Sequence, residues 1–403
     1  RFLTPFLPFA CIFIQEGIKE ISDRLLPISG KKTLIKSAII NSFIIIILIV
    51  LISPSIAFSQ KMHANPTVPF EGVSDQGKYF KSLAEKAFIS DTASLMVPDL
   101  GGNSYYSGLW VIDYAGLADI AIAHHGWARE FFEDYVFNET KPTFLHIHGT
   151  WTLRAQIDKF PQFWTDYVPI SMSYWKPVEP ELLAYSAYSK QGTLSGDFVR
   201  KDVFVARNIT PENTMHYKFN TIELQGFNLT NNLTKKDGKI HYTFFWKCLN
   251  EMSNDYNLVL NISQNEKRLY QTEYSPIYGW YPTSKWIKGE ILKEEVDIML
   301  PENISEGKYN ISIRVVDTCT CESEGQEANL GSIEVNNEKT IETAQSHYDK
   351  YLKYDYDGEF EAALDEIKDA IVYHPENISY KNCLNNTYVE LSNLYYEHAE
   401  QHI

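Results

Sequence analysis

Two stretches of the chain alternate apolar and polar residues with a period of two. In KIHYTFFWKC the apolar set is Ile240, Tyr242, Phe244, Trp246 and Cys248, and in KYNISIRVV it is Tyr309, Ile311, Ile313 and Val315. Successive side chains of a strand point to opposite faces, so this alternation predicts half-buried antiparallel strands. With NLVLNIS and the turn signals KKDGK and SEGK, it predicts a β-sandwich over residues 197–336.

Strand and helix patterns alternate between residues 61 and 196. KYFKSLAEKAF predicts a helix, and SLMVPDLGG and LWVIDYAGL predict short apolar strands that end in turn residues. ADIAIAHHGWAREFFEDYVF predicts one helix, and KPTFLHIHG another strand. Strands that alternate with helices are typical of a small α/β unit.

Residues 337–403 have a helical pattern. DGEFEAALDEIKDAIVYHPEN resembles the second helix of a tetratricopeptide repeat, with matching residues at Gly358, Phe360, Ala363, Ala370 and Pro375. The preceding helix fits less well, because His347 and Lys350 stand where the repeat usually has Trp and Leu. We therefore expect at most one repeat and a capping helix, Tyr380 to His398, that serve as a docking or capping element.

The N-terminal 60 residues have the apolar runs of membrane segments. Ser37 to Ala57 carries no charge and is about 20 residues long, which is the length of a membrane-spanning helix. A shorter run over residues 2–21 predicts a second crossing. Lysines at 31, 32 and 36 place residues 22–36 in the cytoplasm and everything after about residue 60 outside the cell. A signal peptide cleaved after Ser55-Ile56-Ala57 is the alternative, and it also exports the rest of the chain.

Together these patterns predict a multi-domain α+β protein: membrane helices in residues 1–60, an α/β unit in 61–196, a β-sandwich in 197–336 and a helical tail in 337–403. The 403 residues, 44% of them hydrophobic, are enough for two or three domains with cores. A net charge of -16 argues against a nucleic-acid partner, since phosphate binding needs a basic face. Because the chain opens with Arg1 inside an apolar run, we expect it to be the C-terminal part of a longer polypeptide.

The cysteines and the glycosylation sequons are also consistent with export of the residues after the membrane segment. All nine N-x-[ST] sequons lie beyond the membrane segment, although an Asn-rich composition explains them equally well. The five cysteines are too few and scattered for a zinc framework. Cys248 can pair with Cys319 or Cys321 in an oxidising compartment, or the thiols can stay free.

Histidines and aspartates of the α/β unit are the first candidates for chemistry. His146 and His148 share one face of a strand, where they offer two metal ligands, and His124 and His125 offer a third. Without an HExxH, a DxD or a cysteine pair beside them, we favour structural or surface histidines and predict no metal or other cofactor.

Asp113 and Asp119 have structural interpretations too. Asp113 ends a strand, where a carboxylate often accepts N–H groups of the next turn, and Asp119 stands where it can cap the helix that begins near Ala118. A ligand contact is the minority alternative for both. In the sandwich, Trp280 and Trp286 can stack on sugar rings, but such residues more often fill the core.

Three segments resemble parts of one family. SLMVPDLGGNSYYSGLWVIDYAGLADIAIAHH resembles a segment after the last membrane helix of GT-C-type membrane glycosyltransferases, which use polyprenyl-phosphate sugars and include mannosyl- and arabinosyltransferase-like proteins. RFLTPFLPF resembles the start of one of their late transmembrane helices, and YGWYPTSKWIKGEILKEEVDIMLPENISEGKY resembles an attached extracytoplasmic module.

The resemblance implies a function and also a limit to it. Family members do their chemistry on an Asp-bearing loop after the first transmembrane helix, and this chain has no such loop, so no residue here inherits the catalytic role. Asp113, Gly116, Leu117 and Asp119 match a motif of architectural character. The expected function is an accessory, extracytoplasmic C-terminal portion of such an enzyme, inactive alone, with membrane lipid and a polyprenyl-phosphate sugar as partners. The alternative is a non-enzymatic, membrane-anchored surface protein whose sandwich binds glycan and whose tail docks a protein.

Overall fold

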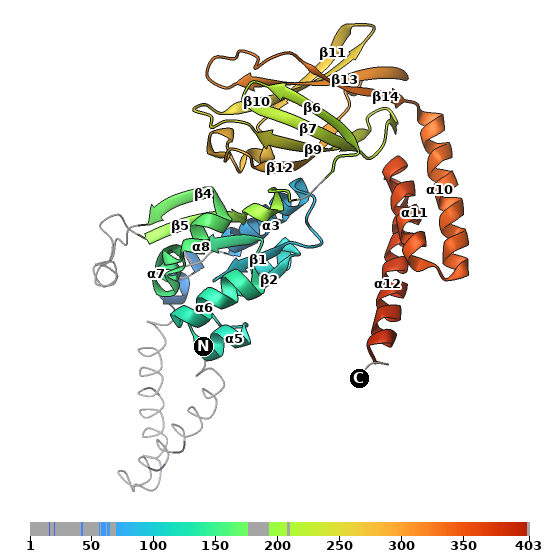
Figure 1. Cartoon of the computed structure of the whole chain (residues 1–403). Helices are drawn as coiled ribbons and strands as arrows, with labels where there is room; N and C mark the ends of the chain where they lie inside the picture. Colours follow the sequence, from blue (N-terminus) through green and yellow to red (C-terminus); the bar gives the residue numbers. More distant parts are fainter. Residues whose placement is uncertain are drawn as a thin grey trace. The chain divides into compact units, whose positions relative to one another are not determined.

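The computed structural model describes residues 70–175, 193–207 and 210–400, together with single residues and two short runs, 58–61 and 63–64, before residue 70. The expected membrane crossings at 2–21 and 37–57 lie outside these ranges. Within the described residues, no helix is both long and apolar enough to cross a membrane. The chain divides into two compact units, Arg1–Val73 and Ser74–Ile403. Apart from residues 70–73, the elements discussed below lie in the second unit, and Figure 1 labels most of them.

A mixed five-stranded sheet opens the second unit. Its order is β2-β1-β3-β5-β4; β2, β1 and β3 run parallel, and β5 is antiparallel to both of its neighbours. The strands are β1 (Ser94–Val97), β2 (Trp110–Asp113), β3 (Phe144–Ile147), β4 (Tyr167–Trp175) and β5 (Thr193–Arg200). The principal helices around them are α3 (Phe70–Lys86), α4 (Gly102–Ser107), α7 (Gly149–Ala155) and α8 (Pro161–Asp166). The predicted α/β character is confirmed.

The single helix expected over residues 118–137 is wrong. The structure has α5 (Ile120–His125), α6 (Arg129–Asp134) and a π-helical segment, Tyr135–Thr140. Gly126 ends α5 with φ 61° and ψ -143°, a conformation that a helix cannot continue. Apolar periodicity persists across this break, which is why the pattern predicted one helix.

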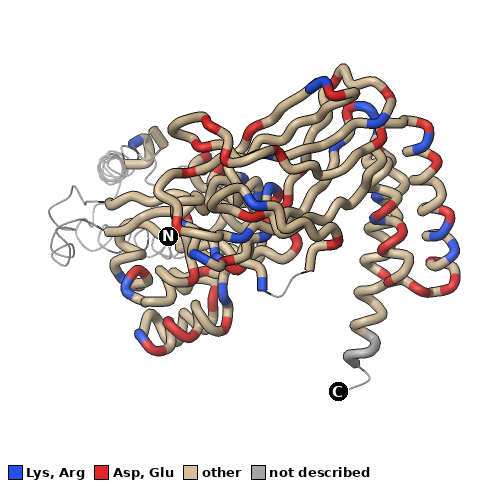
Figure 2. Tube along the Cα trace, turned by 45° about the horizontal axis from the view of Figure 1, so that its top comes forward, with Lys and Arg blue, Asp and Glu red and all other residues tan. Residues whose placement is uncertain are grey.

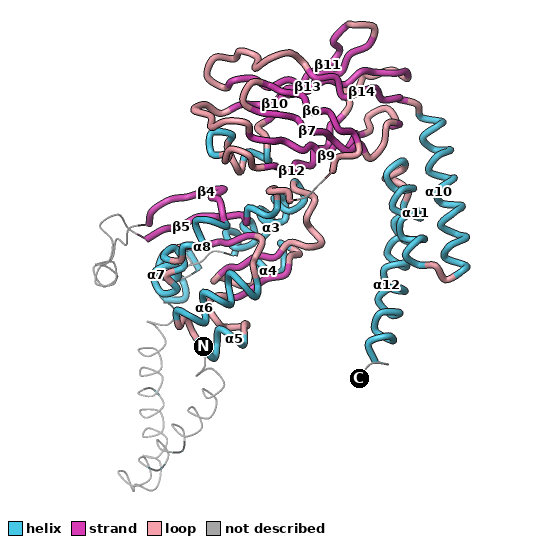
Figure 3. The backbone as a smooth tube through the Cα atoms, viewed as in Figure 1, coloured by secondary structure: helices cyan, strands magenta, loops and turns pink. Residues whose placement is uncertain are grey.

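Two further sheets form the sandwich (Figure 3). One has the order β11-β10-β13-β14-β8 and the other β12-β9-β7-β6, and all pairs are antiparallel except β14 with β8. The strands are β6 (Asn213–Phe219), β7 (Ile222–Leu229), β8 (Leu233–Thr234), β9 (Lys239–Cys248), β10 (Tyr256–Gln264), β11 (Lys267–Tyr274), β12 (Ile291–Met299), β13 (Gly307–Asp317) and β14 (Ala328–Val335).

The alternation in β9 and β13 predicted the buried face correctly. All nine residues of the two apolar sets are buried, and their core includes residues from both sheets. Residue 197, the expected start of the sandwich, lies inside β5 of the first sheet, and the first sandwich strand begins at Asn213.

One apolar core joins the first sheet to the sandwich. Leu95 and Val97 of β1 belong to this core together with Phe80 of α3, whereas Met96 belongs to the core on the opposite face of the sheet. The ring of Phe144 lies 6.0 Å from that of Trp280, and Lys86 Nζ donates a hydrogen bond to the Tyr278 carbonyl. Helix α3 therefore packs between the first sheet and the sandwich.

Three helices, α10 (Asn337–Asp357), α11 (Phe360–Tyr373) and α12 (Ile378–Glu400), make up the C-terminal region. Gly358 ends α10 in the left-handed conformation, at φ 76°, and Ala363 and Ala370 are fully buried between helices. The predicted helical tail is confirmed; its relation to tetratricopeptide repeats stays a prediction. Figure 2 shows acidic and basic positions interspersed along these helices, with no continuous basic stripe on them.

Candidate functional site

Two histidine–aspartate pairs lie at the carboxyl end of the parallel strands. His146 Nδ1 is 2.7 Å from Asp197 Oδ1, and His148 Nε2 is 2.7 Å from Asp99 Oδ2. The antiparallel register of β3 and β5 sets His146 opposite Asp197, and Asp99 follows the end of the neighbouring β1. The two imidazole rings are 5.1 Å apart. We call these four residues the histidine edge.

Two amide side chains orient His146 and Asp197, the inner pair of the histidine edge. Asn103 Nδ2 donates to Gln76 Oε1 at 2.8 Å and to the Asp99 carbonyl at 2.7 Å. This orients the Gln76 amide so that its Nε2, 2.9 Å from His146 Nε2, acts as a donor. In this arrangement His146 Nε2 accepts from Gln76 and His146 Nδ1 donates to Asp197.

Burial and charge distinguish the inner pair from the outer one. The side chains of His146 and Asp197 are 15% and 16% exposed, whereas those of His148 and Asp99 are 36% and 32% exposed. The hydrogen bond from His148 lowers the pKa of Asp99 despite partial burial, so Asp99 is ionised at neutral pH. Burial, followed by the nearby Asp197 charge, raises the pKa of Tyr79.

The histidine edge therefore contains a largely buried pair, His146 with Asp197, and a partly exposed pair, His148 with Asp99. Carboxylates, imidazoles and the amides beside them offer hydrogen-bond donors and acceptors, the chemistry that recognises hydroxyl groups. Ligands of open α/β sheets bind at the carboxyl ends of parallel strands, which is where this edge lies.

Asp113 has the structural role that its position predicted. It is only 2% exposed, and its carboxylate accepts the backbone N–H groups of Ala115, Leu117 and Ala118 at 2.9, 2.6 and 2.7 Å. The side chain closes the turn after β2.

Asp119 is the predicted helix cap. Its carboxylate accepts the Ile122 N–H at 3.0 Å and the Tyr135 hydroxyl at 2.6 Å, which ties the start of α5 to the π-helical segment. Burial and the Asp119 carboxylate raise the pKa of Tyr135.

The other candidate residues do not join the histidine edge. His124 and His125 are exposed in the last turn of α5, where the ring of His125 packs 4.5 Å from that of Phe131. Among the described residues, the one group of three possible metal-ligating side chains is His347, Glu366 and Asp369 in the tail, not the α/β histidines.

Trp280 and Trp286 are buried in the sandwich and present no stacking face to solvent. Their exposed fractions are 4% and 3%, and Trp286 Nε1 donates to the Tyr281 carbonyl. Filling of the core, the interpretation favoured for both, agrees with their positions.

Four residues of the site escaped sequence reasoning. Asp99 has a local signal, because it follows an apolar strand in VPDL just as Asp113 does in WVID. Asp197, Gln76 and Asn103 have none, since strand register and helix packing bring them to the histidines.

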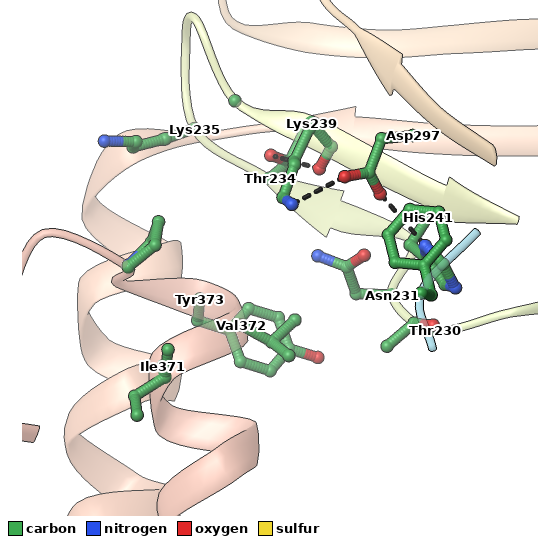
Figure 4. Close-up of a pocket in the computed structure, with 13 residues that line it drawn as sticks. Thr230, Asn231, Thr234, Lys235, Lys239, His241, Asp297, Ile371, Val372 and Tyr373 are labelled. Carbon is green, nitrogen blue, oxygen red and sulfur yellow. Dashed lines mark hydrogen bonds and ion pairs between the residues drawn. The ribbon is translucent and has the colours of Figure 1, made fainter. Parts of the chain in front are cut away.

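A second polar cluster lies between the sandwich and α11, around a cavity of about 300 Å³ (Figure 4). His241 Nδ1 is 2.9 Å from Asp297 Oδ1, and Lys239 Nζ donates to Asp297 Oδ2 at 2.6 Å. Burial lowers the pKa of His241, but hydrogen bonds to Asp297 and Glu295 outweigh it and raise the pKa to about 9. His241 is thus a structural cation with both acidic partners in place.

A family described as a domain of unknown function, DUF8728, matches residues 75–202, which extend from α3 to just beyond β5. No curated protein matches the chain. Among solved structures, the C-terminal domain of wzt matches with 10% identity and a TM-score of 0.23, covering 32% of this chain and 82% of that one. A CARDB domain from Pyrococcus furiosus, solved with di-metal ions, matches with 14% identity and a TM-score of 0.19, covering 32% and 95%. The sporulation control protein Spo0M from Bacillus subtilis matches with 10% identity and a TM-score of 0.19, covering 31% and 53%.

Proposed function

We propose that the chain is the extracytoplasmic C-terminal portion of a membrane glycosyltransferase that takes its sugar from a polyprenyl-phosphate donor. In this proposal the portion is accessory: the catalytic loop belongs to another part of the enzyme, and residues after about 60 lie outside the cell. The resemblance of three separate segments to GT-C-type enzymes, in the same order along the chain, motivates it.

The observation that carries the proposal is the histidine edge. Its two carboxylate-paired imidazoles stand where ligands of open α/β sheets bind, and Ser171 Oγ adds a hydroxyl by donating to Asp197 Oδ2 at 2.8 Å. Such a set can hold the hydroxyl groups of a sugar near a separate catalytic base. Asp113 and Asp119 are both occupied by structural hydrogen bonds, which favours an accessory role over catalysis for this unit.

Transfer by the full-length gene product in liposomes tests the proposal. A radiolabelled sugar, mannose or arabinose, is supplied on polyprenyl phosphate, and its transfer to a glycan acceptor is measured. We expect the full-length protein to transfer at least one sugar and residues 1–403 alone to transfer none. Failure of the full-length protein to consume either donor would refute this proposal.

Substitutions then test the role of the histidine edge. We expect His146→Asn with His148→Asn to raise the KM for donor or acceptor about 5- to 10-fold, as for one or two lost hydrogen bonds. The matched control is His124→Asn with His125→Asn on exposed α5, which should leave both KM values unchanged. Equal effects of the two double variants would remove the histidine edge from the proposal.

A further inference from the structure

A groove of about 900 Å³ runs between the edge strands of the two sandwich sheets. β11 is the edge of one sheet and β12 the edge of the other, and the C-terminal end of α3 contributes Lys86 to the same wall. Tyr270, Tyr274 and Tyr278 line the groove together with Glu294. The volume lies within the range of about 300 to 1,000 Å³ that is typical of small-molecule sites.

Glu294 interrupts an apolar strand face. The inward-facing residues of β12 include Leu292, Val296 and Ile298, and Glu294 lies among them with only 1% of its surface exposed. Its Oε1 accepts the Ile277 N–H at 2.6 Å, and the indole N–H of Trp246 also interacts with this carboxyl and lowers its pKa, although neither that N–H nor Oε2 makes a well-formed hydrogen bond within the described residues. A buried polar atom without a partner costs about 1–3 kcal/mol, so this oxygen requires an explanation.

The hydroxyl of Tyr274 is a second such group in the same groove. It is buried and likewise makes no hydrogen bond among the described residues, and its pKa is raised by burial and by the Glu294 charge. Burial also raises the pKa of Glu294 to about 8, so that this carboxyl is mostly protonated at pH 7. The Tyr274 hydroxyl is therefore a donor without an acceptor among the described residues of this wall.

A strained turn presents Tyr278 to the groove. Ile277, Tyr278 and Gly279 have φ values of 50°, 58° and 76°, and a β-branched residue rarely adopts this region. Three bonds hold the turn: Glu294 accepts the Ile277 N–H, Lys86 Nζ donates to the Tyr278 carbonyl at 2.9 Å, and the Tyr278 hydroxyl accepts the Glu295 N–H at 3.1 Å. Backbone strain of this kind concentrates at ligand sites.

We propose that this groove binds a neutral oligosaccharide. The partly exposed rings of Tyr270 and Tyr274 and the side chain of Val296 provide surfaces for the C–H faces of sugar rings, while Thr272, Glu295 and Asp297 pair with sugar hydroxyls. A shift of the Tyr274 ring on ligand entry then gives its buried hydroxyl the partner that it lacks among the described residues. Three carboxylates in the lining, from Glu85, Glu295 and Asp297, outnumber its two lysines, Lys86 and Lys239, and so disfavour an anionic ligand.

An extended peptide fits the groove less well, because β12 is already partly paired along its outer edge. The Lys293 N–H donates to the Phe204 carbonyl, the Ala206 N–H donates to the Ile291 carbonyl, and Val205 bridges to Leu292. Strand addition along the first part of β12 is therefore blocked. The saccharide site stands independently of the proposed transferase, since it depends on the sandwich and α3 alone.

Saturation-transfer NMR on the purified full chain tests the site. Mannotriose and maltotriose are the neutral saccharide probes, and an extended hexapeptide represents the alternative kind of ligand. We expect at least one trisaccharide to bind, and we expect Tyr274→Phe, which removes one hydroxyl, to weaken binding about 5- to 30-fold. Tyr356→Phe, the same change at a 90% exposed tyrosine of α10, is the matched control and should have no effect.

A second variant separates loss of binding from loss of folding. Tyr270→Ala, on the half-buried edge strand β11, removes a ring without touching the buried carboxyl, and it should also weaken binding while the melting temperature stays near the parental value. Binding that neither variant changes would overturn the site. So would binding of the hexapeptide in place of both trisaccharides, or binding of no probe at millimolar concentration. None of these measurements uses transferase activity, so they test the saccharide site independently of the proposed function.

Discussion

Substitution of Glu294 by Gln should change how the stability of the sandwich depends on pH. The pKa of Glu294 is raised from 4.5 to about 8, with burial as the largest cause, whereas the unfolded chain has the ordinary value. The folded state therefore prefers the protonated carboxyl. This contribution to stability is fully present below pH 4.5 and is lost as pH rises through 8.

The two pKa values set the size of the effect. Each pH unit between them is equivalent to about 1.4 kcal/mol, so the interval corresponds to at most about 5 kcal/mol of unfolding free energy. That amount is comparable to the whole stability of many domains. Gln resembles the protonated carboxyl in shape but does not titrate, so Glu294→Gln should remove this part of the pH dependence.

His241 does not affect the comparison between the parent and Glu294→Gln, although its raised pKa changes stability with pH in the same direction. Its contribution is present below its ordinary value of 6.5 and is lost as pH rises through about 9. Both proteins keep His241, so its effect cancels in the difference between them. The lowered pKa values of Glu295 and Asp297 matter only at acidic pH and cancel in the same way.

Cys248 offers a readout confined to the sandwich. Its thiol is free and fully buried in β9, the strand that pairs with β12, so a sulfhydryl reagent reaches it only when the sandwich opens. Urea titrations at pH 5, 6, 7 and 8, followed by pulse alkylation and peptide mass spectrometry, give the unfolding free energy at each pH. Parallel curves for the parent and Glu294→Gln would refute the assignment of a buried, protonated acid.

Three further outcomes follow from the described contacts. Asp113→Asn should lower the unfolding free energy by about 1–3 kcal/mol in thermal denaturation, because three turn N–H groups lose a charged acceptor. Asp119→Asn should lower the unfolding free energy by about 1 kcal/mol. In the proposed full-length transferase, both changes should reduce yield more than turnover per folded molecule, and lost turnover at parental yield and melting temperature would contradict this. In the native protein, iodoacetamide should modify exposed Cys319 and Cys321 but not Cys248, and protection of either exposed thiol would reveal an unrecognised partner.

Local patterns predicted the fold where one face of an element is buried. In β9 and β13 every second residue is buried, so periodicity alone identified strand, face and core. In α5 and α6 the apolar spacing continues past Gly126, and only the backbone conformation of that glycine shows that the helix ends. A break in backbone conformation changes the spacing of apolar residues very little. The sequence pattern therefore predicted a single helix over residues 118–137.

The candidate sites depend on long-range partners, which explains why sequence reasoning found only part of each. His146 and His148 stood out by their spacing, but their aspartates come from other strands. Glu294 stands beside Glu295 in the charged run KEE, which resembles a solvated strand face. The alternation of Leu292, Val296 and Ile298 places Glu294 on their face of the strand, but only the packed sandwich shows that this carboxyl is fully buried.

Charge limits the kind of ligand that the histidine edge and the groove are suited to bind. The chain has a formal charge of -16, and the three carboxylates of the groove lining outnumber its two lysines, so these surfaces disfavour a polyprenyl phosphate relative to a neutral glycan. Hydrogen-bonding side chains at the histidine edge and tyrosine rings in the groove both suit neutral hydroxylated ligands. If the chain belongs to a transferase, it therefore acts on the acceptor glycan or on the sugar itself. Neutralisation of the donor phosphate then falls to cationic residues elsewhere in the enzyme, since the described carboxyl-rich surfaces oppose it.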